Sequence, residues 1–128
     1  MQRHQDWMKQ AVSDLKHAKN SLIAGDFEWS CFAAHQAAEK AIKSLYQRLH
    51  LDAWGHTLSI LLANLPYEIG VSTELIEKGK ILDKHYIISR YPNGFNEGAP
   101  TDFYTRNEAE ESIRLAEEII EYCKSKIN

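Results

Sequence analysis

The sequence predicts an all-α protein, an up-and-down bundle of four to five helices that forms one domain over residues 1–128. Two observations carry this prediction. The six glycines and three prolines fall, with the exception of Gly79, between apolar runs that have the three-and-four spacing of helices. No run of six or more residues alternates cleanly between apolar and polar, so no strand is expected. With 128 residues and 44% hydrophobic content, the chain can bury a core of moderate size.

The first two helices are predicted over about residues 5–24 and 27–49, and they should form an antiparallel hairpin. Gly25 can adopt the left-handed conformation that ends a helix, and Asp26 can cap the next one. The second helix contains five alanines between residues 33 and 41. These small side chains should let a neighbouring helix approach closely.

A short third helix is predicted over about residues 57–64. It is apolar nearly all round, so it should be well buried. Ser72 is a good cap for a fourth helix over about residues 73–90, and a close helix contact could explain Gly79 inside it. Because Pro92 disfavours helical geometry at Tyr91, this helix should end near Arg90.

Residues 91–104 are expected to form an irregular loop, which is long for a compact bundle and of a kind that is often functional. The sequence "TRNE", starting at Thr105, matches the capping-box pattern. It predicts a fifth helix that runs from there to about Ser125.

Composition narrows the functional classes. The net charge of −3 and pI of about 6.1 argue against a constitutively basic nucleic-acid binder. No long apolar span and no signal peptide is recognisable, so a cytoplasmic protein without a membrane segment is expected. Cys31 and Cys123 are expected to be two buried thiols in place of a disulfide. No cysteine or aspartate cluster accompanies the histidines, so neither a metal nor another cofactor is expected.

The second helix carries a first group of candidate ligand-binding residues. His35, Glu39 and Lys43 are spaced by four and share one face, and Lys40 lies on an adjoining strip. Such a face could bind an anion or a nucleotide. Spacing alone favours the alternative, a solvated surface with a Glu39–Lys43 pair. His56, at the start of the third helix, is either a ligand residue or a local cap.

The segment around Arg90 is the second candidate. Arg90 offers a planar fork of donors suited to phosphate. Tyr91 adds a ring and a hydroxyl, Asn93 a turn with backbone amides, and Tyr104 lies at the far end of the same loop. Alternatively, Arg90 closes its own helix by facing the negative end of the macrodipole. Spacing alone favours neither interpretation.

Four segments together resemble one known family. The segments are "W…A..DL..A" in the first helix, "CFAAHQAAEKAIKSLY" in the second, "GHTL" before the third and "LDKHYIISRYPNG" in the fourth. They resemble the HEPN domain over about residues 7–122. The resemblance implies a bundle of four or five helices and a homodimer. Such proteins are often encoded beside an MNT-type nucleotidyltransferase and can form toxin–antitoxin pairs with it. It further implies that the dimer uses the fourth helix, the loop after Arg90 and part of the second helix.

The same resemblance bears on catalysis. Many HEPN proteins are metal-independent ribonucleases that use an arginine followed, after four to six residues, by a histidine. Arg90 matches the arginine, but Phe95, Asn96 and Glu97 occupy the histidine positions. The resemblance therefore implies first a protein that binds a nucleotide, an RNA phosphate or a nucleotidyltransferase partner. A ribonuclease that uses Arg90 with His35, His56 or His85 is the alternative, and a non-catalytic protein-interaction module is the third.

Overall fold

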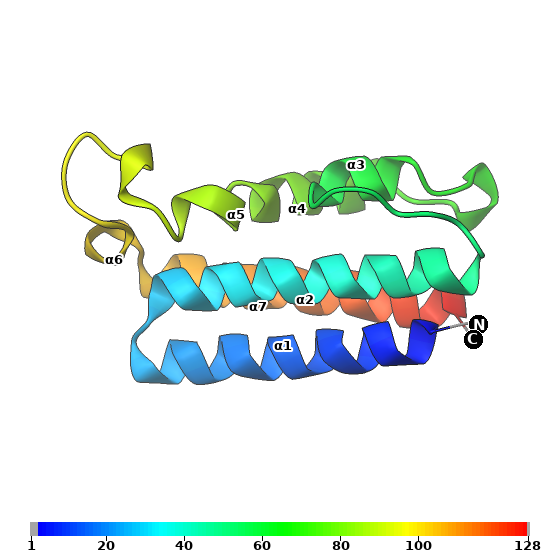
Figure 1. The fold of residues 1–128 in the computed structure, drawn as a ribbon, viewed down its shortest axis with the longest axis horizontal. Helices are drawn as coiled ribbons and strands as arrows, with labels where there is room; N and C mark the ends of the chain where they lie inside the picture. Colours follow the sequence, from blue (N-terminus) through cyan, green and yellow to red (C-terminus); the bar gives the residue numbers. More distant parts are fainter. Residues whose placement is uncertain (1–2, 128) are drawn as a thin grey trace.

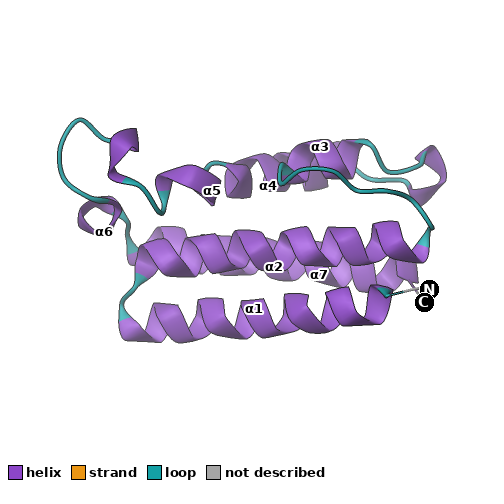
Figure 2. Ribbon diagram, viewed as in Figure 1, coloured by secondary structure: helices purple, strands orange, loops and turns teal. Residues whose placement is uncertain are grey.

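The structure is a computed structural model that describes residues 3–127. Within this range every regular element is a helix, which confirms the all-α prediction (Figure 2). The 3-10 turns are Tyr67–Ile69 and Pro92–Gly94. The α-helices are α1 (His4–Ala24), α2 (Phe27–Arg48), α3 (Leu58–Ala63), α4 (Thr73–Asp83), α5 (His85–Ile88), α6 (Pro100–Phe103) and α7 (Arg106–Ile127).

The long helices run up and down along one axis (Figure 1). In that view α1 lies along one side, α2 and α7 lie in the middle, and α3, α4 and α5 cover the other side. The described parts of the chain that approach the two termini meet at one end of the bundle. Residues 91–104 lie at the opposite end, beyond α5.

The core is built around α2, as its alanine content predicts. Ala34, Ala37, Ala38 and Ala41 are completely buried, and these small side chains allow α1 and α7 to pack directly against α2. The larger side chains that fill the space between the helices are Ile42, Leu45, Leu58, Leu62, Leu82, Ile119 and Ile120.

At the connection between α1 and α2, the helix end predicted at Gly25 is confirmed and the cap predicted at Asp26 is wrong. Gly25 has a φ of 83°, and its amide donates to the Leu22 carbonyl at 3.1 Å, as expected of a left-handed helix end. The Asp26 side chain makes no capping hydrogen bond. Its ψ of 72° departs from the extended conformation that capping side chains need.

Helix α3 differs from its prediction in two respects. Ile60 is 56% exposed, because α3 packs on α4 through one side only, with Leu58 and Leu62 buried. No side chain of α3's own N-terminus caps it. The close contact predicted for Gly79 is confirmed, because a Cβ atom there would lie 3.2 Å from both Leu62 Cδ1 and the Ser59 backbone nitrogen.

The predicted fourth helix, residues 73–90, is interrupted at Lys84, which separates α4 from α5. Lys84 has φ −62° and ψ −24°, the geometry of a tighter 3-10 turn, so the chain continues in the same direction while the α-helical ladder breaks. The Ser72 cap of α4 is confirmed, with Ser72 Oγ accepting from the Leu75 amide at 3.0 Å.

The remaining predictions concern the second half of the chain. The capping box before α7 is confirmed: Thr105 Oγ1 accepts from the Glu108 amide, and Glu108 Oε1 accepts from the Thr105 amide. The segment 91–104, predicted as an irregular loop, contains a 3-10 turn and α6 and is held by Phe95 stacked on Phe103.

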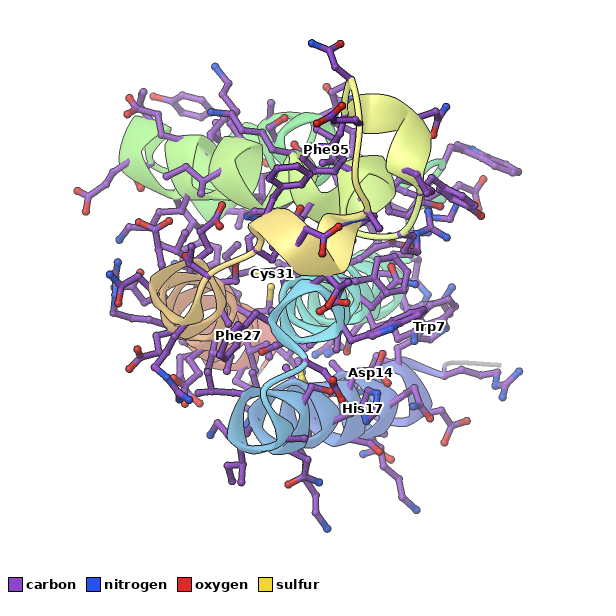
Figure 3. All side chains as sticks on the ribbon, turned by 90° about the vertical axis from the view of Figure 1, so that its left-hand side faces the viewer. Trp7, Asp14, His17, Phe27, Cys31 and Phe95 are labelled. Atoms are coloured by element: carbon purple, nitrogen blue, oxygen red, sulfur yellow. The ribbon has the colours of Figure 1, made fainter. Side chains whose placement is uncertain are left out.

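Both cysteines are free and buried, as predicted. Figure 3 shows Cys31 in the interior of the bundle, near Phe27. Burial raises the pKa of both thiols to about 12. They are therefore neutral packing groups at ordinary pH.

Candidate functional site

Arg90 follows the end of α5 and uses one part of its side chain to close that end. Its Nε donates to the Tyr86 carbonyl at 2.8 Å. The guanidinium carbon lies 4.4 Å from the Phe32 ring centroid, 4.8 Å from that of Tyr86 and 5.2 Å from that of Tyr91. Within residues 3–127, no carboxylate pairs with this guanidinium, and its terminal nitrogens make no hydrogen bond.

Tyr86 connects Arg90 to a histidine from a distant part of the chain. The His56 ring stacks on Tyr86 with 5.0 Å between centroids and 15° between planes. Nδ1 of His56 lies 3.0 and 3.1 Å from the two carboxylate oxygens of Glu39. Because an ionised carboxylate can only accept, Nδ1 carries the hydrogen of this contact, and in the neutral form of the ring Nε2 keeps its lone pair. The His56 side chain is 53% exposed, so this nitrogen belongs to a solvent-accessible ring.

Glu39 is buried, and its carboxylate accepts hydrogen bonds from two side chains. It accepts from Lys43 Nζ at 3.0 Å in addition to His56. Arg90, Tyr86, His56, Glu39 and Lys43 therefore form one continuous set of contacts, drawn from α2, the segment before α3 and the end of α5.

His35 contacts two members of this set, His56 and Tyr86, from the interior of the bundle. It is fully buried, and its Nε2 donates to the His56 carbonyl at 3.0 Å. It also lies 3.7 Å from Asp83 Oδ1 and 5.0 Å, centroid to centroid, from Tyr86. His35 therefore positions His56 and Tyr86 and is not open to a ligand.

Asp83 fixes the same region from α4. Its carboxylate accepts from the Leu58 amide at 2.6 Å, the Ser59 amide at 3.1 Å and Ser59 Oγ at 2.7 Å. Burial alone would raise the pKa of Asp83, but the His35 ring 3.7 Å away and the hydrogen bonds from Ser59 and Leu58 outweigh this and hold the pKa below its ordinary value. This acidic side chain caps α3 and so holds His56 beside Tyr86.

Two predicted residues are engaged elsewhere. Lys40 pairs with Asp14 of α1 and does not join Glu39 and Lys43. The Tyr104 hydroxyl bonds to Nδ1 of the buried His85 at 2.8 Å, and burial raises the pKa of Tyr104 well above its ordinary value. Burial also lowers the pKa of His85. Tyr104 therefore anchors the 91–104 segment to α5.

The residues directly after Arg90 are exposed. Tyr91 is 49% exposed with Arg90 over its ring, and Asn93 lies in the 3-10 turn Pro92–Gly94. Sequence reasoning missed Phe32, Tyr86 and Asp83. A signal for Tyr86 exists in its spacing of four from Arg90, and for Phe32 in its spacing of three from His35, each of which puts the pair on one helix face.

Across residues 3–127, no group of three or more histidine, cysteine, aspartate or glutamate side chains is placed to hold a metal ion. Within the same range, none of the helices has both the length and the apolar character needed to cross a membrane.

The helical bundle matches one class of protein. A HEPN domain model matches residues 4–126, so the chain belongs to the HEPN family, as its motifs predicted. A protein of Methanocaldococcus jannaschii named "Putative toxin MJ1304" is 30% identical over 127 residues, which span 92% of this chain and 84% of that protein.

Solved structures agree. TT1696 from Thermus thermophilus has a TM-score of 0.96 at 46% identity, over 98% of this chain and 99% of that one. ST0689, described as an archaeal HEPN homologue, has a TM-score of 0.82 at 40% identity over the whole of both chains. A HEPN domain protein from Thermotoga maritima has a TM-score of 0.77 at 36% identity, over 94% of this chain and 95% of that one.

Proposed function

We propose that this HEPN protein binds a phosphate-bearing ligand, a nucleotide or an RNA phosphate, at Arg90. The observation that carries the proposal is the guanidinium geometry. Its Nε is fixed on the Tyr86 carbonyl and its plane lies among three aromatic rings, while its terminal nitrogens have no partner within residues 3–127. The two terminal NH2 groups of this planar fork are suited to two phosphate oxygens. The rings reduce the mobility of the fork before a ligand arrives.

The test is calorimetric titration of the wild type and Arg90→Ala with adenosine 5′-monophosphate. A charge-assisted contact of about 1.5–3 kcal/mol predicts a loss of roughly 10- to 100-fold in affinity. Arg106→Ala is the matched control, because Arg106 lies 5.1 Å over the ring of Phe27, which is not one of the three rings that contact Arg90. Equal affinity in wild type and Arg90→Ala would rule the proposal out.

A metal-independent ribonuclease is the second candidate, and His56 is the observation that favours it. Glu39 holds the His56 ring through Nδ1, so that Nε2 can accept a proton when the ring is neutral, and Tyr86 contacts both His56 and Arg90. In RNA cleavage, the 2′-hydroxyl would lose its proton to Nε2 as its oxygen attacks phosphorus. Arg90 would stabilise the negative charge on the phosphorane, and the 5′-oxygen would leave with a proton returned by the imidazolium or by water.

This candidate predicts RNA cleavage that persists in excess chelator and is lost in His56→Gln. Glu39→Gln should lower the rate less, because it leaves the imidazole in place but removes the partner that orients it. Retention of full cleavage in His56→Gln, or no cleavage by the wild type, would leave the protein as a binding module.

The proposal extends to partners. We propose that the chain is the HEPN half of a toxin–antitoxin pair, and the relative named as a putative toxin supports this role. The family resemblance further suggests a homodimer in the cytoplasm with an MNT-type nucleotidyltransferase as its partner. Co-expression with an MNT-type nucleotidyltransferase should give a stable complex on size-exclusion chromatography. A complex that forms without any nucleotide or RNA binding would favour a purely protein-binding role.

A further inference from the structure

We propose that a cavity between α1 and α2, next to Arg90, binds a nucleobase that carries an exocyclic amino group. This inference rests on the proposed phosphate site and adds the part of the ligand that the phosphate site does not recognise. The cavity has a volume of about 220 Å³. It is lined by Asp14, His17, Trp29, Phe32, Ala33, Gln36 and Lys40.

The size of the cavity suits one planar ring system. It is smaller than the roughly 300–1,000 Å³ of pockets that enclose a complete drug-sized molecule. Asp14 and His17 lie on the side of α1 that faces α2 (Figure 3), and Trp29 and Phe32 come from the first turns of α2. A base could enter here, but its sugar and phosphate would remain outside.

Phe32 joins this cavity to the phosphate site. Its ring lines the cavity, and the Arg90 guanidinium carbon lies 4.4 Å from the same ring centroid. A nucleotide with its base in the cavity can therefore present its phosphate to Arg90. Trp29 stands edge-on to Phe32 with 6.1 Å between centroids and is 49% exposed. An accessible indole at the mouth of the cavity offers a stacking surface for the base.

The polar groups of the cavity select a neutral hydrogen-bond donor. Gln36 Oε1 is buried and, among the described residues, has no hydrogen-bond partner. An unpaired buried acceptor is costly, so a ligand that donates to it gains affinity once the Gln36 amide turns from its shielded position toward the cavity. The Asp14 carboxylate already pairs with Lys40, so this lysine is not available to a second phosphate. The exocyclic amino groups of adenine, cytosine and guanine are donors of the required kind.

The experiment compares three probes by calorimetry on the wild-type protein: adenosine 5′-monophosphate, uridine 5′-monophosphate and ribose 5-phosphate. The adenine nucleotide should bind at least tenfold more tightly than ribose 5-phosphate, because stacking and the Gln36 contact add to the phosphate contact. Trp29→Ala should reduce adenine-nucleotide affinity about tenfold and leave ribose 5-phosphate affinity unchanged. Gln36→Met should narrow the preference for adenine over uracil about 3- to 10-fold.

Trp54→Ala is the matched control, since Trp54 is 82% exposed and lines a different groove, and it should change none of these affinities. A second readout uses Trp7→Phe/Trp54→Phe, in which Trp29 is the remaining tryptophan. Adenosine, which has no phosphate, should quench the fluorescence of Trp29 in this variant. In a separate measurement, Trp29→Phe should retain most of the affinity for adenosine 5′-monophosphate, because phenylalanine also offers a ring for stacking.

The outcomes separate the two proposals. Equal affinities for adenosine 5′-monophosphate and ribose 5-phosphate, both abolished by Arg90→Ala, would overturn the base site and leave the phosphate site intact. Tighter binding of the uracil nucleotide would also overturn it, because uracil has no exocyclic amino group. Affinities that Arg90→Ala does not change would overturn the phosphate site and, with it, this inference.

Discussion

At the scale of single residues, Arg90 shows that two competing interpretations of one side chain can both hold. A guanidinium has five N–H donors, so closing a helix end with Nε leaves the terminal nitrogens for another task. The Tyr86 carbonyl takes Nε, and the aromatic rings of Phe32, Tyr86 and Tyr91 take the faces of the fork. The helix-end contact therefore orients the same group that we propose binds phosphate.

Tyr104 gives a prediction that separates structure from ligand binding. Tyr104→Phe removes the hydroxyl that bonds to Nδ1 of the buried His85, so the free energy of unfolding should fall by about 1 kcal/mol in urea titrations. Nucleotide affinity should be unchanged, because the hydroxyl is already occupied. Tyr67→Phe, at a tyrosine that is 96% exposed, should alter neither quantity. A Tyr104→Phe protein of normal stability that no longer binds nucleotide would contradict this role.

The sequence allowed part of the site to be predicted, residue by residue. The chemistry of Arg90 follows from its type, and the Glu39–Lys43 pair follows from a spacing of four. Lys40 does not join that pair, because each helical residue turns by about 100°, which carries Lys40 away from Glu39 and toward Asp14 of α1. The stack of His56 on Tyr86 joins residues from separate elements, and only the tertiary packing of α2, α3 and α5 creates it.

At the scale of elements, the N-terminus of α3 depends on a side chain from α4. Asp83→Asn should lower the free energy of unfolding at pH 7, because the charged acceptor of the Leu58 and Ser59 groups is lost. The native pKa of Asp83 is below its ordinary value of 3.8, so its contribution is complete above that pH and is lost as the pH falls below it. The stability difference between wild type and variant should therefore shrink as urea titrations move from pH 7 to below 3.8.

An unchanged difference at both pH values would show that the ionised form of Asp83 is not what stabilises α3. Glu77→Gln on the same helix is a suitable control, because no ion pair or hydrogen bond of its side chain lies within residues 3–127.

Gly79 gives a second prediction for the α3–α4 contact. An alanine in a helix is ordinarily about 1 kcal/mol more favourable than glycine. Here its Cβ would meet the Ser59 backbone nitrogen and Leu62 Cδ1, both at 3.2 Å, and α3 would have to move. Gly79→Ala should therefore give no rise in thermal midpoint by circular dichroism. A clear rise would show that α3 shifts at little cost.

The elements also show why some boundaries escaped prediction. Helices α1, α2 and α7 have strong apolar periodicity, and explicit turn residues separate them from the segments beside them. No glycine or proline marks the break between α4 and α5, which consists of one tighter turn at Lys84. The cap of α3 comes from Asp83, a contact between residues 24 and 25 positions apart, so the local sequence around Thr57 contains no trace of it.

At the scale of the whole molecule, the face around Arg90 combines the site with exposed apolar side chains. Ile87 and Ile88 of α5 are 49% and 39% exposed, directly before Arg90. This agrees in location with the dimer face expected from the family resemblance. The candidate ligand site and the expected contact with a second copy would then share one surface.

Ile87→Glu should therefore weaken the homodimer by at least tenfold in analytical ultracentrifugation, because a buried unpaired charge is costly. Ile23→Glu, at an isoleucine of α1 that is 82% exposed, is the control and should leave the association constant unchanged. A wild type that sediments as a monomer, or equal effects of both substitutions, would place the contact elsewhere or remove it.

The two shielded thiols have a practical consequence. Because both cysteine thiols are buried among the helices and protonated, maleimide reagents should not react with the wild-type protein. A cysteine introduced at Asn93 would then be the sole reactive position, and a fluorophore or spin label attached there would report directly on events beside the guanidinium without any background to remove.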